Sequence, residues 1–309
     1  MTPLPRTLAP PLPAFLEREL PFARSLVELG GVRLHVMEAG RGPTTAVFLH
    51  GNPTWGFLWR RVAAPLAAEG LRVLLVDLAG LGLSDKPRDP AFHTLEHHAH
   101  LVGALLDDLA PEPLVLVVHD WGGPIGLGAM ADRPGRLAGL VVTNTVLGPP
   151  RSGARPTSFH RFANAPLVSA AAFRLLGFPQ NALGLTQADR RSISGDVARA
   201  YRWPLRRIAD RIAPLALARL VPTGAAHPSL AALGRVREVA AAFRGPAAIV
   251  WGERDPILGR ALRSAAELLP HATVTRVPAG HYLQEETPGA VADAVRDVAD
   301  RVVRGGRAG

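Results

Sequence analysis

Four short segments of this sequence combine polar or aromatic side chains with glycine, and each follows a stretch of apolar residues. Asp120, Asp255 and His281 lie in three of them, in this order along the chain. A carboxylate can attack a substrate carbon, a histidine can activate the water that completes the reaction, and a second carboxylate can orient that histidine. The four segments are residues 50–55, 118–123, 251–256 and 280–285.

Asp120 stands at the turn between an expected strand and an expected helix. Gly122 lies two residues further on, where the close approach of neighbouring backbone requires a small side chain. Val118 occupies the corresponding position before Asp120, where glycine is usual. The following helix would direct its amino-terminal N–H groups at Asp120 and so favour a negative charge there. We therefore interpret Asp120 as a nucleophile rather than as a helix cap.

Apolar stretches alternate with amphipathic ones over most of the chain, after a hairpin expected over residues 25–38. Apolar strands that alternate with helices are typical of a parallel sheet covered on both faces. Because such sheets bind ligands at the carboxyl ends of their strands, the four polar segments are expected to meet at one edge. The expected strands cover 46–49, 71–76, 114–118, 137–142, 247–250 and 273–277, and the expected helices cover 57–68, 95–109, 124–131, 260–268 and 288–303.

The alternation stops between residues 147 and 227. This stretch is rich in arginine, alanine and proline, and helical pieces are expected over 166–176, 188–201 and 205–220. We interpret it as an inserted helical cap, so that residues 1–147 and 228–309 form the core and residues 148–227 form the cap. The large apolar residues of the cap are candidates either for lining a substrate pocket or for forming the cap's own core: Phe159, Phe162, Phe173, Leu176, Phe178 and Trp203.

The sequence resembles haloalkane dehalogenases in residues 50–54, 78–87, 119–122 and 280–286, with Tyr282 where phenylalanine is common. The resemblance covers most of 28–145 and 236–303 and is weak in the cap, where only residues 201–204 fit. It implies an α/β-hydrolase fold, a mostly parallel sheet flanked by helices with an inserted helical cap. Asn144 stands where one branch of the family has a glutamate, and Asp255 stands in the loop that the other branches use. With Asn52 in the early loop and Asp255 in the late one, the chain is most similar to the third subfamily.

This resemblance implies hydrolysis of carbon–halogen bonds in haloalkanes to an alcohol and a halide ion, through a covalent alkyl ester. Asp120 would be the nucleophile, His281 the general base and Asp255 the triad acid. The side-chain N–H groups of Asn52 and Trp121 would bind the departing halide without adding charge, and their backbone N–H groups would form an oxyanion hole. The expected partners are a small apolar halogenated substrate, water and halide, with no cofactor and no metal.

Other activities stay open on the same scaffold. An epoxide hydrolase shares the aspartate nucleophile but usually uses two cap tyrosines as acids, and only Tyr201 of the two tyrosines here is free to serve. A fluoroacetate dehalogenase would have arginine in place of Trp121, and an esterase would have serine in place of Asp120. A cofactor-free luciferase-like oxygenase shares the core. A non-catalytic ligand-binding protein of this fold usually lacks a triad member, whereas all three are present here.

Composition narrows the class of protein further. The 35 basic and 26 acidic residues give a net charge of +9, but the arginines are scattered and lack aromatic interleaving, so no nucleic-acid partner is expected. Disulfides and thiol nucleophiles are excluded because there is no cysteine. No apolar run has the length of a signal peptide or a bilayer span, so we expect a cytoplasmic protein without a membrane partner. Whether it forms a homo-oligomer stays open.

Three neighbouring histidines raise the question of a metal site. His97 and His98 are adjacent and therefore face apart on an expected helix, and no spacing typical of a metal site accompanies them and His100. We expect these histidines on a solvated helix face.

Overall fold

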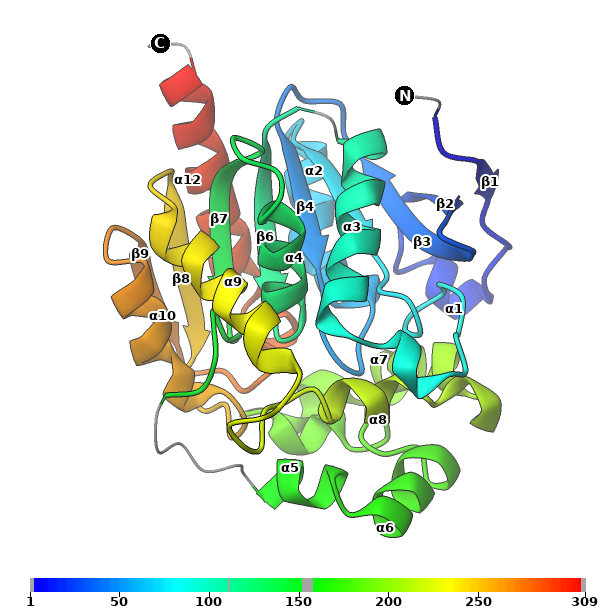
Figure 1. The fold of residues 1–309 in the computed structure, drawn as a ribbon. Coiled ribbons are helices and arrows are strands. Elements are labelled where there is room, and N and C mark those ends of the chain that lie inside the picture. Colours follow the sequence, from blue (N-terminus) through cyan, green and yellow to red (C-terminus); the bar gives the residue numbers. More distant parts are fainter. Residues whose placement is uncertain (1–2, 111, 152–157, 307–309) are drawn as a thin grey trace.

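Nine strands form a single sheet in a computed structural model that describes residues 3–110, 112–151 and 158–306 (Figure 1). The strand order is β1-β2-β3-β5-β4-β6-β7-β8-β9. Neighbours from β1 to β5 pair antiparallel, and neighbours from β5 to β9 pair parallel. The predicted fold class is confirmed. The strands are β1 (Arg6–Leu8), β2 (Ala23–Leu29), β3 (Val32–Ala39), β4 (Thr45–Leu49), β5 (Arg72–Val76), β6 (Leu114–His119), β7 (Leu137–Thr143), β8 (Ala247–Gly252) and β9 (Thr273–Val277).

Helices cover both faces of the sheet, as Figure 1 shows. Successive side chains of β4 enter opposite cores, since Val47 packs with the helices of one face and Phe48 with those of the other. Strands buried on both faces explain why their sequences are continuously apolar. One face carries α3 (Leu95–Leu109), α4 (Gly122–Met130), α9 (Ser229–Ala242) and α10 (Leu262–Leu268), and the other carries α1 (Ala14–Glu17), α2 (Arg60–Ala68), α11 (Leu283–Glu286) and α12 (Pro288–Gly306).

The described part of the segment between β7 and α9 is helical and lies across the carboxyl ends of the strands (Figure 1). Its helices are α5 (Ser158–Ala163), α6 (Pro166–Ala170), α7 (Gly195–Arg202) and α8 (Ala213–Ala218). The long helices expected over 188–201 and 205–220 are wrong in extent. Asp189 accepts a hydrogen bond from the N–H of Arg191 and begins a separate short 3₁₀ helix, and Gly195 has a φ of 52° at the start of α7. Pro214 lies in the first turn of the shorter α8.

The large apolar residues of this helical segment divide into a core and a surface. Four phenylalanines pack against one another with ring-centroid separations of 5.3 to 6.4 Å: Phe159, Phe162, Phe173 and Phe178. Leu176, by contrast, is 73% exposed. Trp203 packs edge-on against Phe15 of α1 with centroids 5.9 Å apart. The phenylalanines therefore form the core of this segment, whereas Leu176 lies on its surface.

Two polar side chains beside the sheet, Asp77 and His98, are buried. Asp77, which follows β5, is fully buried and accepts hydrogen bonds from the N–H groups of Gly56 and Leu83. The expected solvated face of α3 is wrong for His98, which is 1% exposed and lies 3.2 Å from the imidazole of His93. Burial and the neighbouring histidines lower the pKa of His98 to about 3, so this ring is neutral. Within the described residues, no helix is long and apolar enough to cross a bilayer.

Candidate active site

The four polar segments follow β4, β6, β8 and β9, whose carboxyl ends lie at the same edge of the sheet. This edge faces the helical segment formed by α5 to α8 (Figure 1). The parallel register aligns Leu49 of β4 with Val118 of β6, so the loops that begin at His50 and at Asp120 start side by side. The sheet therefore brings Asn52 and Asp120 within hydrogen-bonding distance although 68 positions separate them in the sequence.

Asp120 occupies a strained turn between β6 and α4. Its φ is +48°, in the left-handed region that non-glycine residues rarely adopt. The turn is held by hydrogen bonds from the N–H of Asp120 to the carbonyl of Asn144 and from the hydroxyl of Thr145 to the carbonyl of Asp120. A Cβ at Gly122 would lie only 2.1 Å from the carbonyl oxygen of Leu49, which explains why glycine follows at this position. The turn points the carboxylate away from the strand and toward the other loops.

The structure brings Asp120, His281 and Asp255 together in one chain of contacts. The Nδ1 atom of His281 lies 2.8 Å from an Asp255 oxygen, and its Nε2 atom lies 3.8 Å from an Asp120 oxygen. His281 is 1% exposed and Asp255 is 6% exposed, so both are shielded from bulk water. Glu253, the alternative acid in the same loop, is exposed.

Burial and the neighbouring charges shift the pKa values of these three residues. Burial raises the pKa of Asp120, against the opposing effects of His281 and of the N–H groups of Trp121 and Asn52. Burial would also raise the pKa of Asp255, but the charge of His281 and the hydrogen bonds that Asp255 accepts lower it to about 2. Burial opposes the protonation of His281, yet the charge and hydrogen bond of Asp255 raise its pKa above the ordinary value. The arrangement is suited to a histidine that accepts a proton during a reaction.

Asn144 supports the acid from the end of β7. Its side-chain Nδ2 donates to Asp255 at 2.7 Å and to the carbonyl of Gly252 at 3.1 Å, while its Oδ1 accepts from the N–H of Gly252 at 2.8 Å. Asn144 is fully buried and has a φ of +26°. The sequence singled out this position only through the glutamate that some relatives have there.

Replacement of Asn144 by alanine is expected to lower the free energy of unfolding by about 3 kcal/mol, because the buried N–H of Gly252 loses its acceptor and the buried carboxylate of Asp255 loses a donor. Thermal or urea-induced unfolding would measure this loss. Asn164→Ala is a matched control, since Asn164 is exposed and donates only to the nearby carbonyl of His160. Equal stability of the Asn144 and Asn164 variants would contradict the role assigned to these hydrogen bonds.

Asn52 and Trp121 flank the carboxylate of Asp120. The backbone N–H of Asn52 donates to that carboxylate at 2.8 Å, and the N–H of Trp121 also contacts it. The side-chain Nδ2 of Asn52 donates to the carbonyl of Pro214 in α8 at 2.9 Å, which leaves its second hydrogen for a ligand. The indole N–H of Trp121 donates to no residue in the described part of the chain, and the ring is 7% exposed.

The sequence did not predict the hydrogen bonds that hold residues 280–286, here called the histidine loop. The N–H of His281 donates to the carbonyl of Thr186, and the side chain of Gln187 bonds both the N–H and the carbonyl of Tyr282 at 2.9 and 3.1 Å. The carboxylate of Glu286 accepts from the N–H groups of Gly280 and Asp189. The segment between β7 and β8 therefore holds His281 in place. Glutamine and glutamate in loops carry no sequence signal that distinguishes such a role.

Tyr201 lies behind the histidine loop in a buried ionic cluster. Its hydroxyl donates to Glu285 at 2.5 Å, and Glu285 also forms a buried ion pair with Arg60 at 2.6 Å. Burial and the charge of Glu285 raise the pKa of Tyr201 well above its ordinary value. The proton of the Tyr201 hydroxyl is therefore used in its hydrogen bond to Glu285.

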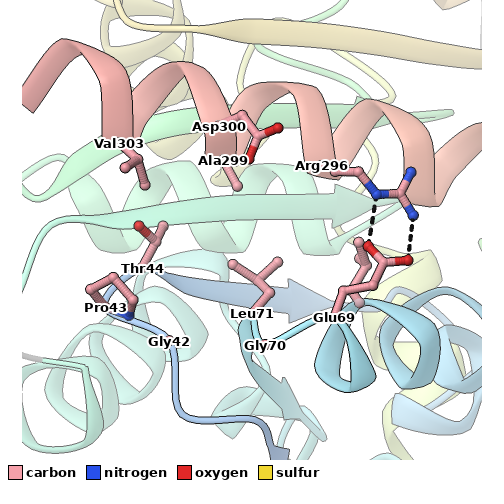
Figure 2. Close-up of a pocket in the computed structure, with 11 residues that line it drawn as sticks. Gly42, Pro43, Thr44, Glu69, Gly70, Leu71, Arg296, Ala299, Asp300 and Val303 are labelled. Atoms are coloured by element: carbon pink, nitrogen blue, oxygen red, sulfur yellow. Dashed lines mark hydrogen bonds and ion pairs between the residues drawn. The ribbon is translucent and has the colours of Figure 1, made fainter.

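A groove of about 330 Å³ lies at the opposite edge of the sheet, before the first residues of β4 and β5. Figure 2 shows Arg296 of α12 reaching Glu69 across it, with the two nitrogen–oxygen contacts at 2.7 and 2.8 Å. None of the five candidate site residues lines this groove. In the described ranges, no group of three or more histidine, aspartate or glutamate side chains is arranged to hold a metal ion.

The sheet order, the strained turn at Asp120 and the late histidine together define an α/β hydrolase, and a family model described as "alpha/beta hydrolase fold" matches residues 46–288. A haloalkane dehalogenase of Mycobacterium marinum is 34% identical over 289 residues, which cover 89% of this chain and 93% of the relative. The chain therefore belongs to the haloalkane dehalogenase family.

Two further comparisons extend this result. The crystal structure of the haloalkane dehalogenase DbeA from Bradyrhizobium elkani superposes with a TM-score of 0.83 at 26% identity, covering 92% of this chain and 99% of that one. A cis-3-alkyl-4-alkyloxetan-2-one decarboxylase of Shewanella oneidensis is 31% identical over 280 residues, which cover 88% of this chain and 86% of the relative.

Proposed function

We propose that this protein hydrolyses haloalkanes to alcohol and halide with Asp120 as nucleophile, His281 as general base and Asp255 as triad acid. The observation that carries the proposal is the chain of contacts from Asp255 through His281 to Asp120, with Asp120 on a strained turn. We also propose that residues 1–147 and 228–309 form the catalytic core, that residues 148–227 form its cap, and that the chain belongs to the third subfamily because it combines Asn52 with Asp255.

In the first step the carboxylate of Asp120 attacks the carbon that bears the halogen. A carbon–oxygen bond forms, the carbon–halogen bond breaks, and the halide leaves with the bonding electron pair. The N–H groups of Trp121 and Asn52 would stabilise the departing anion without adding a positive charge. The product of this step is an alkyl ester on Asp120.

In the second step water attacks the carboxyl carbon of that ester. His281 would take the proton from the water, and Asp255 would stabilise the resulting imidazolium. The backbone N–H groups of Asn52 and Trp121, which contact the carboxylate of Asp120, are placed to stabilise the oxyanion of the intermediate. The bond from the carboxyl carbon to the alkyl oxygen then breaks, and the departing alkoxide takes the proton from His281 and leaves as the alcohol. The enzyme carboxylate is regenerated with one oxygen derived from water, and its remaining proton passes to solvent.

The direct test is release of bromide from a panel of brominated alkanes, with styrene oxide as a second substrate class. Bromide release together with the matching alcohol would support the proposal. Turnover of the epoxide without bromide release would instead assign the protein to the epoxide hydrolases.

Trp121→Phe is expected to lower the rate of bromide release about 100-fold, because the variant keeps the apolar ring but loses the indole N–H that would contact the departing halide. Rapid-mixing measurement of the bromide burst would isolate this step. Trp203→Phe serves as a control, because Trp203 packs against Phe15. An unchanged burst rate in Trp121→Phe would remove Trp121 from the halide site.

Hydrolysis of the ester should fall as the pH decreases through a pKa above 6.5, because His281 must be neutral to accept a proton and its pKa is raised. Asp255→Asn removes the charge that stabilises protonated His281. The acid limb of the curve of hydrolysis rate against pH should therefore move down by about one pH unit, and the maximal rate at higher pH should also fall. Single-turnover rates across pH would show both effects. Glu253→Gln changes an exposed carboxylate in the same loop and should leave the limb in place, and an unmoved limb in Asp255→Asn would contradict the assignment.

The epoxide hydrolase alternative is weakened by the position of Tyr201. An acid for the departing oxygen must reach the substrate, whereas the hydroxyl of Tyr201 donates to Glu285. Tyr282 is 2% exposed, and its hydroxyl donates to no described residue, so it is the tyrosine to replace if epoxide turnover is found.

A second candidate function follows from the relative described as an oxetanone decarboxylase. Attack of Asp120 on the saturated ring carbon that bears the ring oxygen would break the bond to that oxygen. The leaving group would be a carboxylate, which is an anion like halide. Breaking the bond to that carboxylate would release carbon dioxide, form a carbon–carbon double bond and expel Asp120, without water. Formation of an alkene from a cis-3,4-dialkyl oxetanone, in the absence of bromide release from bromoalkanes, would favour this function.

A further inference from the structure

The charge of this protein is unevenly distributed between the two segments of the chain. Residues 148–227 contain 12 of the 35 basic residues but only three of the 26 acidic ones, and the other residues contain 23 of each sign. The segment therefore carries the whole net charge of +9. The arginines are spread along the sequence, as the sequence suggested, whereas the carboxylates avoid this segment. Of its arginines that the structure describes, only Arg151 and Arg199 form ion pairs.

The same segment exposes large apolar side chains. Six of the eight exposed large hydrophobic residues in the described ranges belong to it. Leu175, Leu176 and Ile208 are 62%, 73% and 50% exposed. The remaining three are Leu167, Val168 and Leu185. Exposed leucines beside unpaired arginines are the combination by which proteins adsorb to membrane surfaces.

A cleft of about 310 Å³ adjoins these apolar residues. It is lined by Gln180, Asn181, Arg199, Arg202, Trp203, Leu205, Arg206 and Arg211. Asn181 donates to the carbonyl of Leu176 and Arg211 to that of Leu175, so the cleft and the exposed leucines are contiguous. The guanidinium of Arg206 lies over the ring of Trp203, 4.1 Å from its centroid.

One of the residues that line this cleft has an unsatisfied polar side chain. Gln180 is 4% exposed, and neither its Oε1 nor its Nε2 has a hydrogen-bond partner among the residues that the structure describes. A side-chain amide buried in this way costs free energy unless a ligand or water bonds to it. Arg211 beside it donates only to neutral carbonyls, so its positive charge has no paired carboxylate. The cleft therefore offers both hydrogen bonds and uncompensated positive charge to an oxyanion.

We propose that this face, formed by the cleft together with Leu175, Leu176 and Ile208, binds the surface of an anionic phospholipid membrane. The cleft takes a headgroup phosphate, and the leucines enter the acyl boundary. Attraction of unpaired arginines to anionic lipid and burial of apolar side chains reinforce each other in such contacts. The expectation of no membrane partner was based on the absence of a membrane-spanning segment. A peripheral contact needs no such segment, so this absence does not argue against the proposal.

Nucleic acid is the other large polyanion that unpaired arginines can bind. A nucleic-acid surface uses basic side chains with stacking aromatic residues, and it gains nothing from exposed aliphatic side chains. Here three aliphatic side chains adjoin the cleft, and its one aromatic ring is already covered by Arg206. A lipid surface therefore fits this face better than a nucleic acid. The proposal is independent of the reaction at Asp120.

Co-sedimentation of the full chain with phosphatidylcholine vesicles, prepared with and without phosphatidylglycerol, tests this proposal. Binding should require phosphatidylglycerol and weaken at high salt. Arg202→Glu combined with Arg206→Glu should lower the partition coefficient at least about ten-fold. Leu175→Ser combined with Leu176→Ser should lower it by a similar factor while leaving the salt dependence in place. Thermal unfolding of each variant would establish that it is folded.

The matched control is Arg41→Glu combined with Arg304→Glu. Both arginines are exposed, neither forms an ion pair in the described structure, and the change in net charge is the same. An equal loss of binding in this control would overturn the proposal, because net charge alone would then explain the binding. Stabilisation by inorganic phosphate without vesicle binding would also overturn it and indicate a free phosphate ligand. Binding of duplex DNA that is unaffected by the leucine changes, with no binding to vesicles, would overturn it in favour of a nucleic-acid surface.

Discussion

Replacement of His281 by glutamine is expected to convert multiple turnover into a single event, with one bromide released per protein chain. The attack of Asp120 on the substrate needs no base, so the alkyl ester should form at nearly the normal rate. Its hydrolysis should slow about 10⁴-fold, because glutamine cannot accept the proton of the attacking water. The bromide burst and the mass of the intact protein, increased by one alkyl group in place of one proton, would measure both effects.

The site of the adduct makes this prediction specific. Proteolysis and mass spectrometry should find the alkyl group on the peptide that contains Asp120. His271→Gln is a matched control, because His271 is an exposed histidine that bonds the carbonyl of Gly245. Continued turnover in His281→Gln, or an adduct on any other residue, would contradict the roles proposed for Asp120 and His281.

Replacement of Asp120 by alanine should reduce bromide release to the uncatalysed background, a loss of about 10⁶-fold. The reason is that no other carboxylate can substitute, since Asp255 is held by His281 and Asn144. Asp120→Asn should be equally inactive while preserving the shape of the side chain, which separates loss of the nucleophile from loss of packing. Steady-state bromide release and thermal unfolding of both variants would provide the comparison.

Asp132→Ala is the control for these variants, because Asp132 forms only an exposed ion pair with Arg235. Alanine at position 120 must adopt a φ near +48°, which costs about 1 kcal/mol, so a small loss of stability is compatible with the prediction. Bromide release that persists in both Asp120 variants would show that water attacks the substrate directly, and the covalent route would have to be abandoned.

Short-range patterns in the sequence predicted much of this fold. Continuously apolar strands, alternating helices and Gly122 after Asp120 are local signals, because strand burial and turn geometry depend on neighbouring residues. The sequence alone also revealed the chain order of Asp120, Asp255 and His281. It further identified Asn52 and Trp121 as candidate halide-binding residues. The α9 helix (Ser229–Ala242) and the pairing of β1 (Arg6–Leu8) with β2 were missed, because their residues lack a clear periodic pattern.

The helices between β7 and α9 were predicted less well than the sheet. The position of this segment followed from the interrupted alternation, but the ends of its helices depended on Asp189, Gly195 and Pro214. The separation of the four buried phenylalanines from the exposed Leu176 depended on packing between segments far apart in the sequence. Composition alone could not decide which apolar side chains face water.

The sequence by itself determined the class of protein, the order of the candidate catalytic residues and the architecture that carries them, because each rests on patterns within a few residues. Only the tertiary structure decided the surroundings of each group. It buried Asp255 and left Glu253 exposed, committed Tyr201 to Glu285, and placed Gln187 against the histidine loop. Burial, ion pairing and hydrogen bonding between distant segments set these outcomes, because they depend on which surfaces meet when the chain folds.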